Sequence, residues 1–376
     1  MVHVLFAPDQ NYDCVMCGRG CKTAWQIKVA PEEAERIEQH PLGLRVINRN
    51  GSAFDKSEDG YVIHFPNLDD PRCGFLLDDN RCEIHAELGI DAKPVTCQQF
   101  PFMMTKTPDG IFVGASFFCT SVRENSGRPL QAHEPWLMER MKQGVRATII
   151  GDEVPLSEEQ RTSWADYRAF EQELSRRIGE QGVDLSVQQA LVLTALSGLD
   201  GAPLAQGWND FELEDPPLGG KVNSALDTCH FGLIKLFLEE RTPERLQALD
   251  AAFDAGQGLA MPEFKWQESW FQLLRFQQQA LGERFEDDID RWVAMQVHRK
   301  ALICDRPLLN NLWILALVPR FVRTYTALLT RRAGLDEARR EDYYEALSTA
   351  EAQFGSNGLL ADKLSPRFND FLYQLL

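Results

Sequence analysis

The chain has 376 residues, 44% of them hydrophobic and 25% charged, which is typical of soluble globular proteins and argues against a disordered or fibrous protein. Its length allows one large domain or two ordinary domains, with a sizeable buried core. The formal net charge of −17 argues against binding to nucleic acid or to an anionic membrane, because both need a surplus of Lys and Arg on one face.

The N-terminal region is expected to mix short strands and helices. Its first residues, MVHVLFAPD, lack the positive start and apolar core of a secretory signal, so we expect a cytoplasmic protein. Apolar and polar residues alternate from Trp25 to Val29, which predicts a strand. Pro31 and the two glutamates after it predict a short helix that ends near His40. Further strands are predicted at residues 44–48, 61–65 and 111–118.

After about residue 128 the sequence is typical of long helices. Ser157 with Gln160, and Ser186 with Gln189, have the spacing of a capping box, and Thr242 precedes a proline and a glutamate, so each predicts the start of a helix. We therefore expect an α+β protein. A small cysteine-rich, metal-binding domain is predicted at residues 1–127, and a larger, all-helical domain at residues 128–376.

The most apolar stretch of the chain is PLLNNLWILALVP, at residues 307–319. It is uncharged, but it is shorter than the roughly 20 residues that a helix needs to cross a bilayer. It therefore predicts a buried core helix and no membrane span.

The nine cysteines are distributed unevenly. Cys229 and Cys304 lie in apolar helical surroundings, where a free cysteine is typically a small buried hydrophobe. The other seven lie within the first 119 residues and are the candidate metal ligands: Cys14, Cys17, Cys21, Cys73, Cys82, Cys97 and Cys119. The first three are close enough in sequence to converge on one ion or cluster, and soft thiolates select zinc, cuprous copper or iron–sulfur clusters over hard cations.

Other interpretations of the cysteines remain open. Disulfide pairing fits poorly with an odd number of cysteines in a cytoplasmic protein, whereas a purely structural zinc site is a serious alternative. Seven thiols exceed one tetrahedral site, so the chain has either two metal centres or spare cysteines near one. The radical S-adenosylmethionine spacing, the glycine-rich phosphate loop, GxSxG and HExxH are all absent, and the sequence identifies no catalytic residue.

Two cysteine-bearing segments form a specific pattern. The first is CVMCGRGCKTAWQIKV, from Cys14 to Val29. The second comprises Cys73-Gly74-Phe75-Leu76, Arg81-Cys82-Glu83-Ile84-His85, Lys93-Pro94 and Cys97-Gln98-Gln99-Phe100-Pro101-Phe102. With Cys119, these segments resemble the YkgJ-like zinc- or iron-chelating cysteine-cluster family, including its branch of flagellin lysine-N-methylases, over residues 12–122. A helical segment at 291–325 is similar in its general sequence pattern to the C-terminal half of the methylases.

The resemblance implies a metal-bearing protein with a 4Fe–4S cluster or zinc as cofactor. For the methylase branch it also implies transfer of a methyl group from S-adenosylmethionine to a lysine of a protein substrate similar to flagellin. A noncatalytic zinc- or iron-binding module and a cluster-based redox protein are the alternatives.

Some side chains near the cysteines are expected to support the metal centre. His85 is the best candidate for a ligand other than cysteine, although a hydrogen-bonding role fits it better, and His64 is expected to be structural. A dry aromatic shell over the metal is expected from Trp25, Phe100, Phe102, Phe117 and Phe118.

Overall fold

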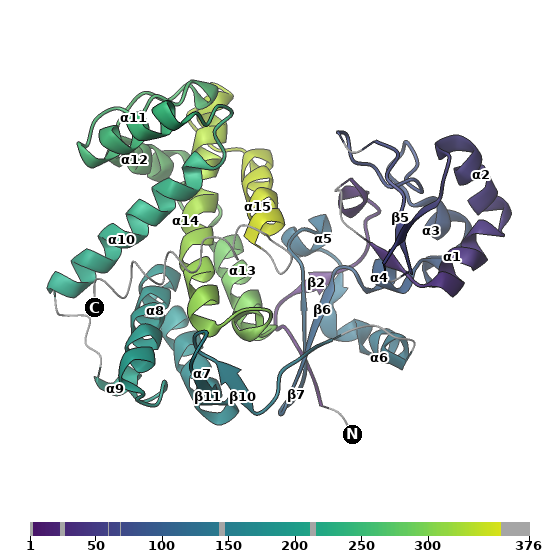
Figure 1. Ribbon diagram of the computed structural model, residues 1–376, viewed down its shortest axis with the longest axis horizontal. Helices are drawn as coiled ribbons and strands as arrows, with labels where there is room; N and C mark the ends of the chain where they lie inside the picture. The colour runs from purple at the N-terminus through teal and green to yellow at the C-terminus, as the bar shows by residue number, and fades with distance from the viewer. Residues whose placement is uncertain are drawn as a thin grey trace. The chain divides into compact units, whose positions relative to one another are not determined.

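The computed structural model describes residues 3–22, 27–58, 60–67, 69–142, 147–210 and 216–354. The chain forms two compact units, Met1–Ile149 and Ile150–Leu376 (Figure 1). The first unit is a mixture of strands and short helices, and the second is mainly helical, so the α+β class predicted for the N-terminal part agrees with the structure.

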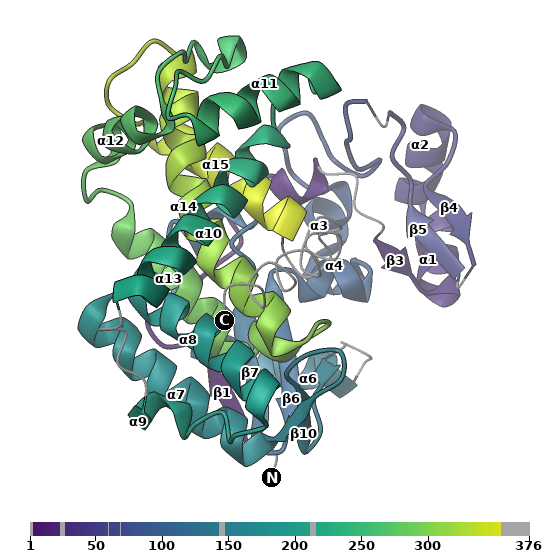
Figure 2. The same ribbon diagram turned by 60° about the vertical axis from the view of Figure 1, so that its left-hand side comes forward.

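A four-stranded sheet lies in the first unit, in the order β1-β7-β6-β9. Its strands are β1 (Val4–Phe6), β6 (Phe102–Thr107), β7 (Gly110–Ala115) and β9 (Thr148–Ile149). β6 and β7 form an antiparallel hairpin, and β1 pairs with β7 in parallel (Figure 2). β9 pairs with β6, also in parallel. Gly110 has a φ of 140°, and a Cβ there would lie 2.4 Å from the His3 carbonyl oxygen, so only glycine lets β1 approach β7.

The boundary between the two units lies between Ile149 and Ile150, after the predicted boundary at 127/128. The 3₁₀ helix η3 (Leu130–His133), α6 (Glu134–Lys142) and β9 all belong to the first unit. The physical reason is pairing, because β9 aligns with Thr105 and Lys106 of β6 and extends the sheet.

A second, three-stranded sheet has the order β3-β5-β4, and α1 packs against β5 and α2. These elements are β3 (Lys28–Val29), α1 (Pro31–Glu38), α2 (Pro41–Asn50), β4 (Phe54–Ser57) and β5 (Gly60–Ile63). The strand predicted at 44–48 is wrong, since this segment is part of α2. His40 caps the helix by accepting a hydrogen bond from the Leu42 amide, and Leu42 and Val46 are buried one turn apart.

The cysteine-bearing part of the first unit is built from short elements. These are η1 (Arg19–Cys21), α3 (Glu83–Leu88), η2 (Ile90–Ala92), α4 (Val95–Gln99) and α5 (Thr120–Arg123), with β2 (Asn11–Tyr12) paired antiparallel to β8 (Arg128–Pro129). Side chains of η1, α3, η2 and α4 join those of the three-stranded sheet in one apolar cluster, whose largest members include Phe54, Phe65 and Phe75.

The second unit begins with a β-hairpin and continues as helices. The hairpin strands are β10 (Glu153–Pro155) and β11 (Arg161–Ser163). The helices are α7 (Trp164–Gln181), α8 (Val183–Asp200), α9 (Gly207–Asp210), α10 (Pro216–Lys235), α11 (Pro243–Asp254), α12 (Trp270–Leu281), α13 (Glu286–His298), α14 (Leu308–Arg332) and α15 (Arg340–Phe354), with 3₁₀ turns η4 (Pro262–Phe264) and η5 (Ala301–Ile303).

The hairpin corrects the prediction that residues 128–376 are all helical. Ser157 and Gln160 form its turn rather than a helix start, because the Leu156 amide donates back to the Gln160 carbonyl across the turn. Ser186 lies inside α8, where its hydroxyl donates to the Gly182 carbonyl, so this predicted start is also wrong. Thr242 caps α11 as predicted.

The helix α14 is the centre of the second unit and packs against α8, α10, α12 and α15. It contains the predicted core segment but continues to Arg332, through Pro319. Among the described helices it alone is long and apolar enough to cross a membrane, and 83% of its apolar 18-residue window is buried inside the protein. Cys229 and Cys304 are buried, as expected.

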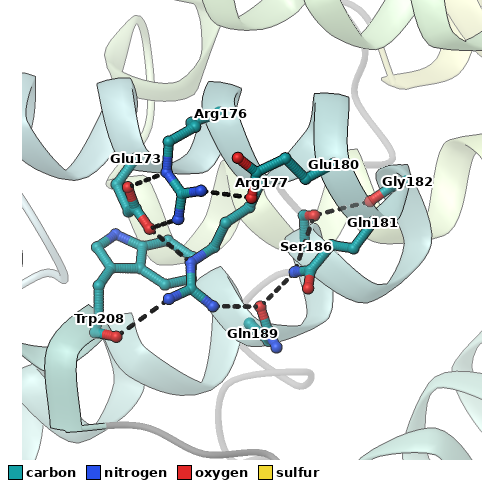
Figure 3. A network of polar contacts seen from close by, with 9 residues as sticks. All are labelled: Glu173, Arg176, Arg177, Glu180, Gln181, Gly182, Ser186, Gln189 and Trp208. Atoms are coloured by element: carbon teal, nitrogen blue, oxygen red, sulfur yellow. Dashed lines mark hydrogen bonds and ion pairs between the residues drawn. The ribbon is translucent and has the colours of Figure 1, made fainter.

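Polar networks connect the helices of this unit. The Arg177 guanidinium, drawn in Figure 3, contacts Glu173 on its own helix, Gln189 on α8 and the Trp208 carbonyl on α9. In a second network the buried Glu171 carboxylate accepts hydrogen bonds from Tyr167 and from the Lys300 ammonium, both at 2.6 Å. It also accepts a hydrogen bond from the partly exposed Arg168 guanidinium.

His230 on α10 is also buried, and its ring lies 5.0 Å from that of Trp270. Burial lowers the pKa of His230 to about 3, and the charge of Arg320 acts in the same direction. His230 is therefore neutral in the folded protein at neutral pH.

Candidate metal centre

A tight loop brings the first cysteines against the segment that carries Cys73 and Cys82. Gly18 has a φ of 67°, and a Cβ there would lie 2.8 Å from the Asn80 carbonyl oxygen and 3.1 Å from the Leu76 side chain. The next turn is η1, whose last residue is Cys21, and the Cys21 carbonyl accepts a 2.7 Å hydrogen bond from the Cys73 amide. The absence of a side chain at Gly18 thus lets two distant ligand segments meet.

Four thiols gather in this region: Cys21, Cys73, Cys82 and Cys97, here called the four-thiol set. All four pack in the apolar cluster of the three-stranded sheet. The side chains of Cys21 and Cys73 are hydrogen-bonded, and Cys97 interacts electrostatically with the other three. The set combines residues from η1, the loop before α3, the N-terminus of α3 and α4.

Lys93 lies beside the four-thiol set. Burial opposes a charge on its ammonium, but the negative potential of Cys97, Cys82 and Cys21 outweighs burial and raises the Lys93 pKa. No role for Lys93 is predictable from the sequence pattern alone, in which it precedes Pro94. Its ammonium can compensate the charge that these thiols acquire when they lose their protons.

The thiols of the set differ in how readily they lose a proton. Burial raises the pKa of Cys97 to about 12 and also raises that of Cys82. The hydrogen bond from Cys73 lowers the Cys21 pKa to about 7, whereas the same bond and burial raise the pKa of Cys73. In the metal-free protein the set therefore carries mostly thiols, which a bound metal must deprotonate.

The chemistry of this donor set fits a thiophilic metal, zinc or iron, because only sulfur donors converge there and a cation lies beside them. The four thiols lie in one region but do not form a ready-made metal site. Across the residues that the structure describes, no three His, Cys, Asp or Glu side chains are spaced to hold a metal ion. Closing on a metal therefore requires the thiols to turn toward one another.

The remaining three predicted ligands form a separate group, here called the three-thiol set: Cys14, Cys17 and Cys119. Cys119 interacts electrostatically with Cys17 and Cys14, and the Tyr12 hydroxyl is hydrogen-bonded to Cys14. Burial raises the pKa of Cys119 to about 11. Cys14 also acts electrostatically on Lys93, so this group lies next to the four-thiol set.

A network of polar side chains positions Cys73 and Cys82. The buried Glu83 carboxylate pairs with Arg49 at 2.9 Å and with Arg45 at 3.3 Å. Arg49 and Asn50, both on α2, also donate to the Gly74 carbonyl, at 2.8 and 3.0 Å. Sequence reasoning missed this network, because its members lie on segments far apart in the chain. The only signal was a glutamate directly after a candidate ligand.

The other side chains considered from the sequence have varied surroundings. Burial and the charge of Lys93 lower the His85 pKa, which places His85 near Lys93. His64 pairs with Asp55 at 2.9 Å, a structural contact. Phe100 packs against Gly20, and Phe118 lies 5.8 Å beneath the Arg19 guanidinium, so part of the aromatic shell lines this loop. Trp25 lies outside the described residues.

These features define a cysteine-rich module with two groups of thiols. Residues 13–121 match the model of the CxxCxxCC family, described as "Putative zinc- or iron-chelating domain". The match supports the resemblance to a cysteine-cluster family in this part of the chain and does not extend to the helical unit. No curated protein and no solved structure matches the chain.

Proposed function

We propose that the first unit binds zinc or iron through the thiolates of the four-thiol set. The observation that carries this proposal is the convergence of Cys21, Cys73, Cys82 and Cys97 in one apolar cluster beside Lys93. Four cysteines are the ligand number of a closed zinc site or of a 4Fe–4S cluster. Of the two, we favour the 4Fe–4S cluster.

Metal and acid-labile sulfide analysis of anaerobically purified full-length protein tests this proposal. We expect metal bound at a stoichiometry that falls when Cys97 is replaced by Ser and is unchanged when Cys229 is replaced by Ala. Equal amounts of iron and sulfide identify a 4Fe–4S cluster, and zinc without sulfide identifies a zinc site. Protein that holds neither metal, and takes up none on reconstitution, contradicts the proposal.

Methyl transfer from S-adenosylmethionine to a lysine of a flagellin-like protein is a second candidate function. Its support is the resemblance of the segments around Cys14 and Cys73 to the cysteine-cluster family that includes the lysine-N-methylases as a branch. Incubation of metal-loaded protein with methyl-labelled S-adenosylmethionine and flagellin tests it. Label on flagellin that is lost in the Cys97→Ser variant supports the enzyme, whereas unlabelled flagellin leaves a noncatalytic module or a redox protein.

A further inference from the structure

A small pocket lies within the helical unit, between the second half of α13, the loop through η5 and the first two turns of α14. The polar side chains that line it are Gln296, Arg299, Asp305, Arg306 and Asn311. Its volume of about 30 Å³ holds about two water molecules, since one water needs about 10–15 Å³. The pocket therefore suits a small polar group rather than a large cofactor.

The side-chain amide of Gln296 supplies a hydrogen-bond donor at this pocket. Arg299 donates to the Gln296 side-chain oxygen through Nε at 3.1 Å and through Nη2 at 2.6 Å. Because this oxygen is turned toward Arg299, the amide nitrogen Nε2 is turned away from it. Among the residues that the structure describes, none accepts a hydrogen bond from Nε2, although Gln296 is only 6% exposed. A buried donor of this kind is stabilised when a ligand supplies an acceptor.

The loop that forms one wall of the pocket is held in an unusual backbone conformation. Lys300 has a φ of 63° and Asp305 a φ of 41°, in the left-handed region where side chains are strained. Asn311 on α14 holds the loop by donating to three of its carbonyl groups, at 3.0, 3.1 and 3.5 Å. The Lys300 ammonium attaches the start of the loop to Glu171 on α7. The pocket wall is thus fixed by the fold, and backbone strain that is fixed in this way is common at ligand sites.

Positive charge prevails at the pocket. Arg299 and Arg306 carry two guanidiniums, and Asp305, which is exposed, is the one acidic side chain among the described residues that line it. A guanidinium has a planar fork of donors that matches the oxygens of a carboxylate or a phosphate. Trp292, which is 5% exposed, adds an apolar wall that excludes water and strengthens such contacts.

We propose that this pocket binds a small oxyanion, a carboxylate or phosphate group, through Gln296, Arg299 and Arg306. The inference goes beyond the proposed function, because it assigns a ligand site to the helical unit, whereas the metal-binding proposal concerns the first unit. The two proposals can therefore fail independently of each other.

Thermal unfolding of the full-length protein tests this inference, with sodium phosphate and sodium acetate as the two probes and sodium chloride at equal ionic strength and pH as the reference. We expect one or both probes to raise Tm in a saturable way, and the stronger probe identifies the kind of oxyanion. In Arg306→Gln, the dissociation constant of this probe should increase at least tenfold. Arg275→Gln is the matched control, because it removes the same charge from an exposed position on α12.

The control variant separates a bound anion from a general effect of salt on stability, which acts on every variant alike. Equal increases of Tm in the wild type, Arg306→Gln and Arg275→Gln, or no increase beyond chloride in any of them, would overturn the inference. The metal content of Arg306→Gln should equal that of the wild type, so either result leaves the proposed function intact.

Hydrogen exchange of the wild type provides a test that does not depend on the folding of a variant. The amides of Arg299, Lys300 and Ile303 are hydrogen-bonded within the loop or to the end of α13, and a bound anion should slow their exchange. Exchange of these amides that is the same in phosphate, acetate and chloride would contradict the proposed site.

Discussion

Replacing Glu83 by Gln is expected to loosen the segment that carries Cys73 and Cys82. The Glu83 side chain is 5% exposed and its carboxylate pairs with two arginines, at 2.9 and 3.3 Å. The amide variant keeps the size of the side chain and one acceptor for Arg49, but it loses the negative charge and turns a donor toward Arg45. The guanidiniums are then left without a matching anion.

The expected loss of stability depends on how exposed the two arginine partners of Glu83 are. A hydrogen bond to a charged group contributes about 1.5–3 kcal/mol, and exposed ion pairs contribute only about 0–1 kcal/mol. The arginine side chains are 44% and 49% exposed, so the pair lies between these limits. We expect a loss of about 2 kcal/mol, which raises the population of the locally opened state about thirtyfold.

Hydrogen exchange measured by mass spectrometry on the full-length, metal-free protein checks this expectation. The amides of Gly74, Leu76 and Glu83, all hydrogen-bonded in the structure, should exchange about thirtyfold faster in the variant. Glu87→Gln is the matched control, because Glu87 is 45% exposed and contacts only Arg45 among the described residues. Equal exchange in the wild type and Glu83→Gln, or faster exchange confined to the helical unit, would refute the reasoning.

Three further predictions concern buried charges and thiols. Lys300→Met removes the buried ammonium partner of the Glu171 carboxylate, which keeps Tyr167 and the Arg168 guanidinium, and should destabilise the helical unit by about 2 kcal/mol in denaturant unfolding. Arg176→Ala, which removes only exposed ion pairs, should have a much smaller effect. The pKa of His230 is about 3 in the folded protein and 6.5 in the unfolded chain, so the unfolded state binds more protons between these pH values. The free energy of unfolding should therefore fall by up to about 1.4 kcal/mol per pH unit as the pH decreases from 6.5 toward 3. His230→Gln should abolish this contribution, and a pH profile that is unchanged in the variant would contradict it. In metal-free protein, thiolate absorbance should report a proton lost near pH 7 from Cys21, and a Cys21→Ser variant that retains this transition would assign it to another thiol.

The sequence predicted those helices whose signals lie within the helix or directly next to it. The proline and glutamates of α1, the cap of α11 and the apolar run of α14 each identify a helix without reference to the rest of the chain. The same local signals were misleading at Ser157, where a serine and a glutamine three residues later form a hairpin turn. They were also misleading at Ser186, inside α8, because side-chain hydrogen bonds to nearby backbone serve turns and helix interiors as well as caps.

The residue types of the candidate site were predictable from the sequence, but the grouping of its thiols in space was not. Soft ligands and their spacing indicated a thiolate metal centre, and the CxxCxxCC match agrees. The separation of Cys21 from Cys14 and Cys17 was not predictable, because sequence proximity grouped all three. The division depends on tertiary contacts, namely the Cys21–Cys73 pairing and the attachment of Asp13 to Ser121.

The parallel pairing of β1 with β7 sets the order in which a nascent chain can fold. Val4 emerges from the ribosome first, yet its partner Ile111 follows six of the seven candidate ligand cysteines. The sheet therefore closes a loop of about a hundred residues, which is entropically costly and slow compared with forming a helix. The four-thiol set is likewise incomplete until Cys97 has been synthesised. Metal loading of the proposed site therefore cannot precede synthesis of the first 97 of the 376 residues, and the growing chain carries its earlier thiols unprotected until then.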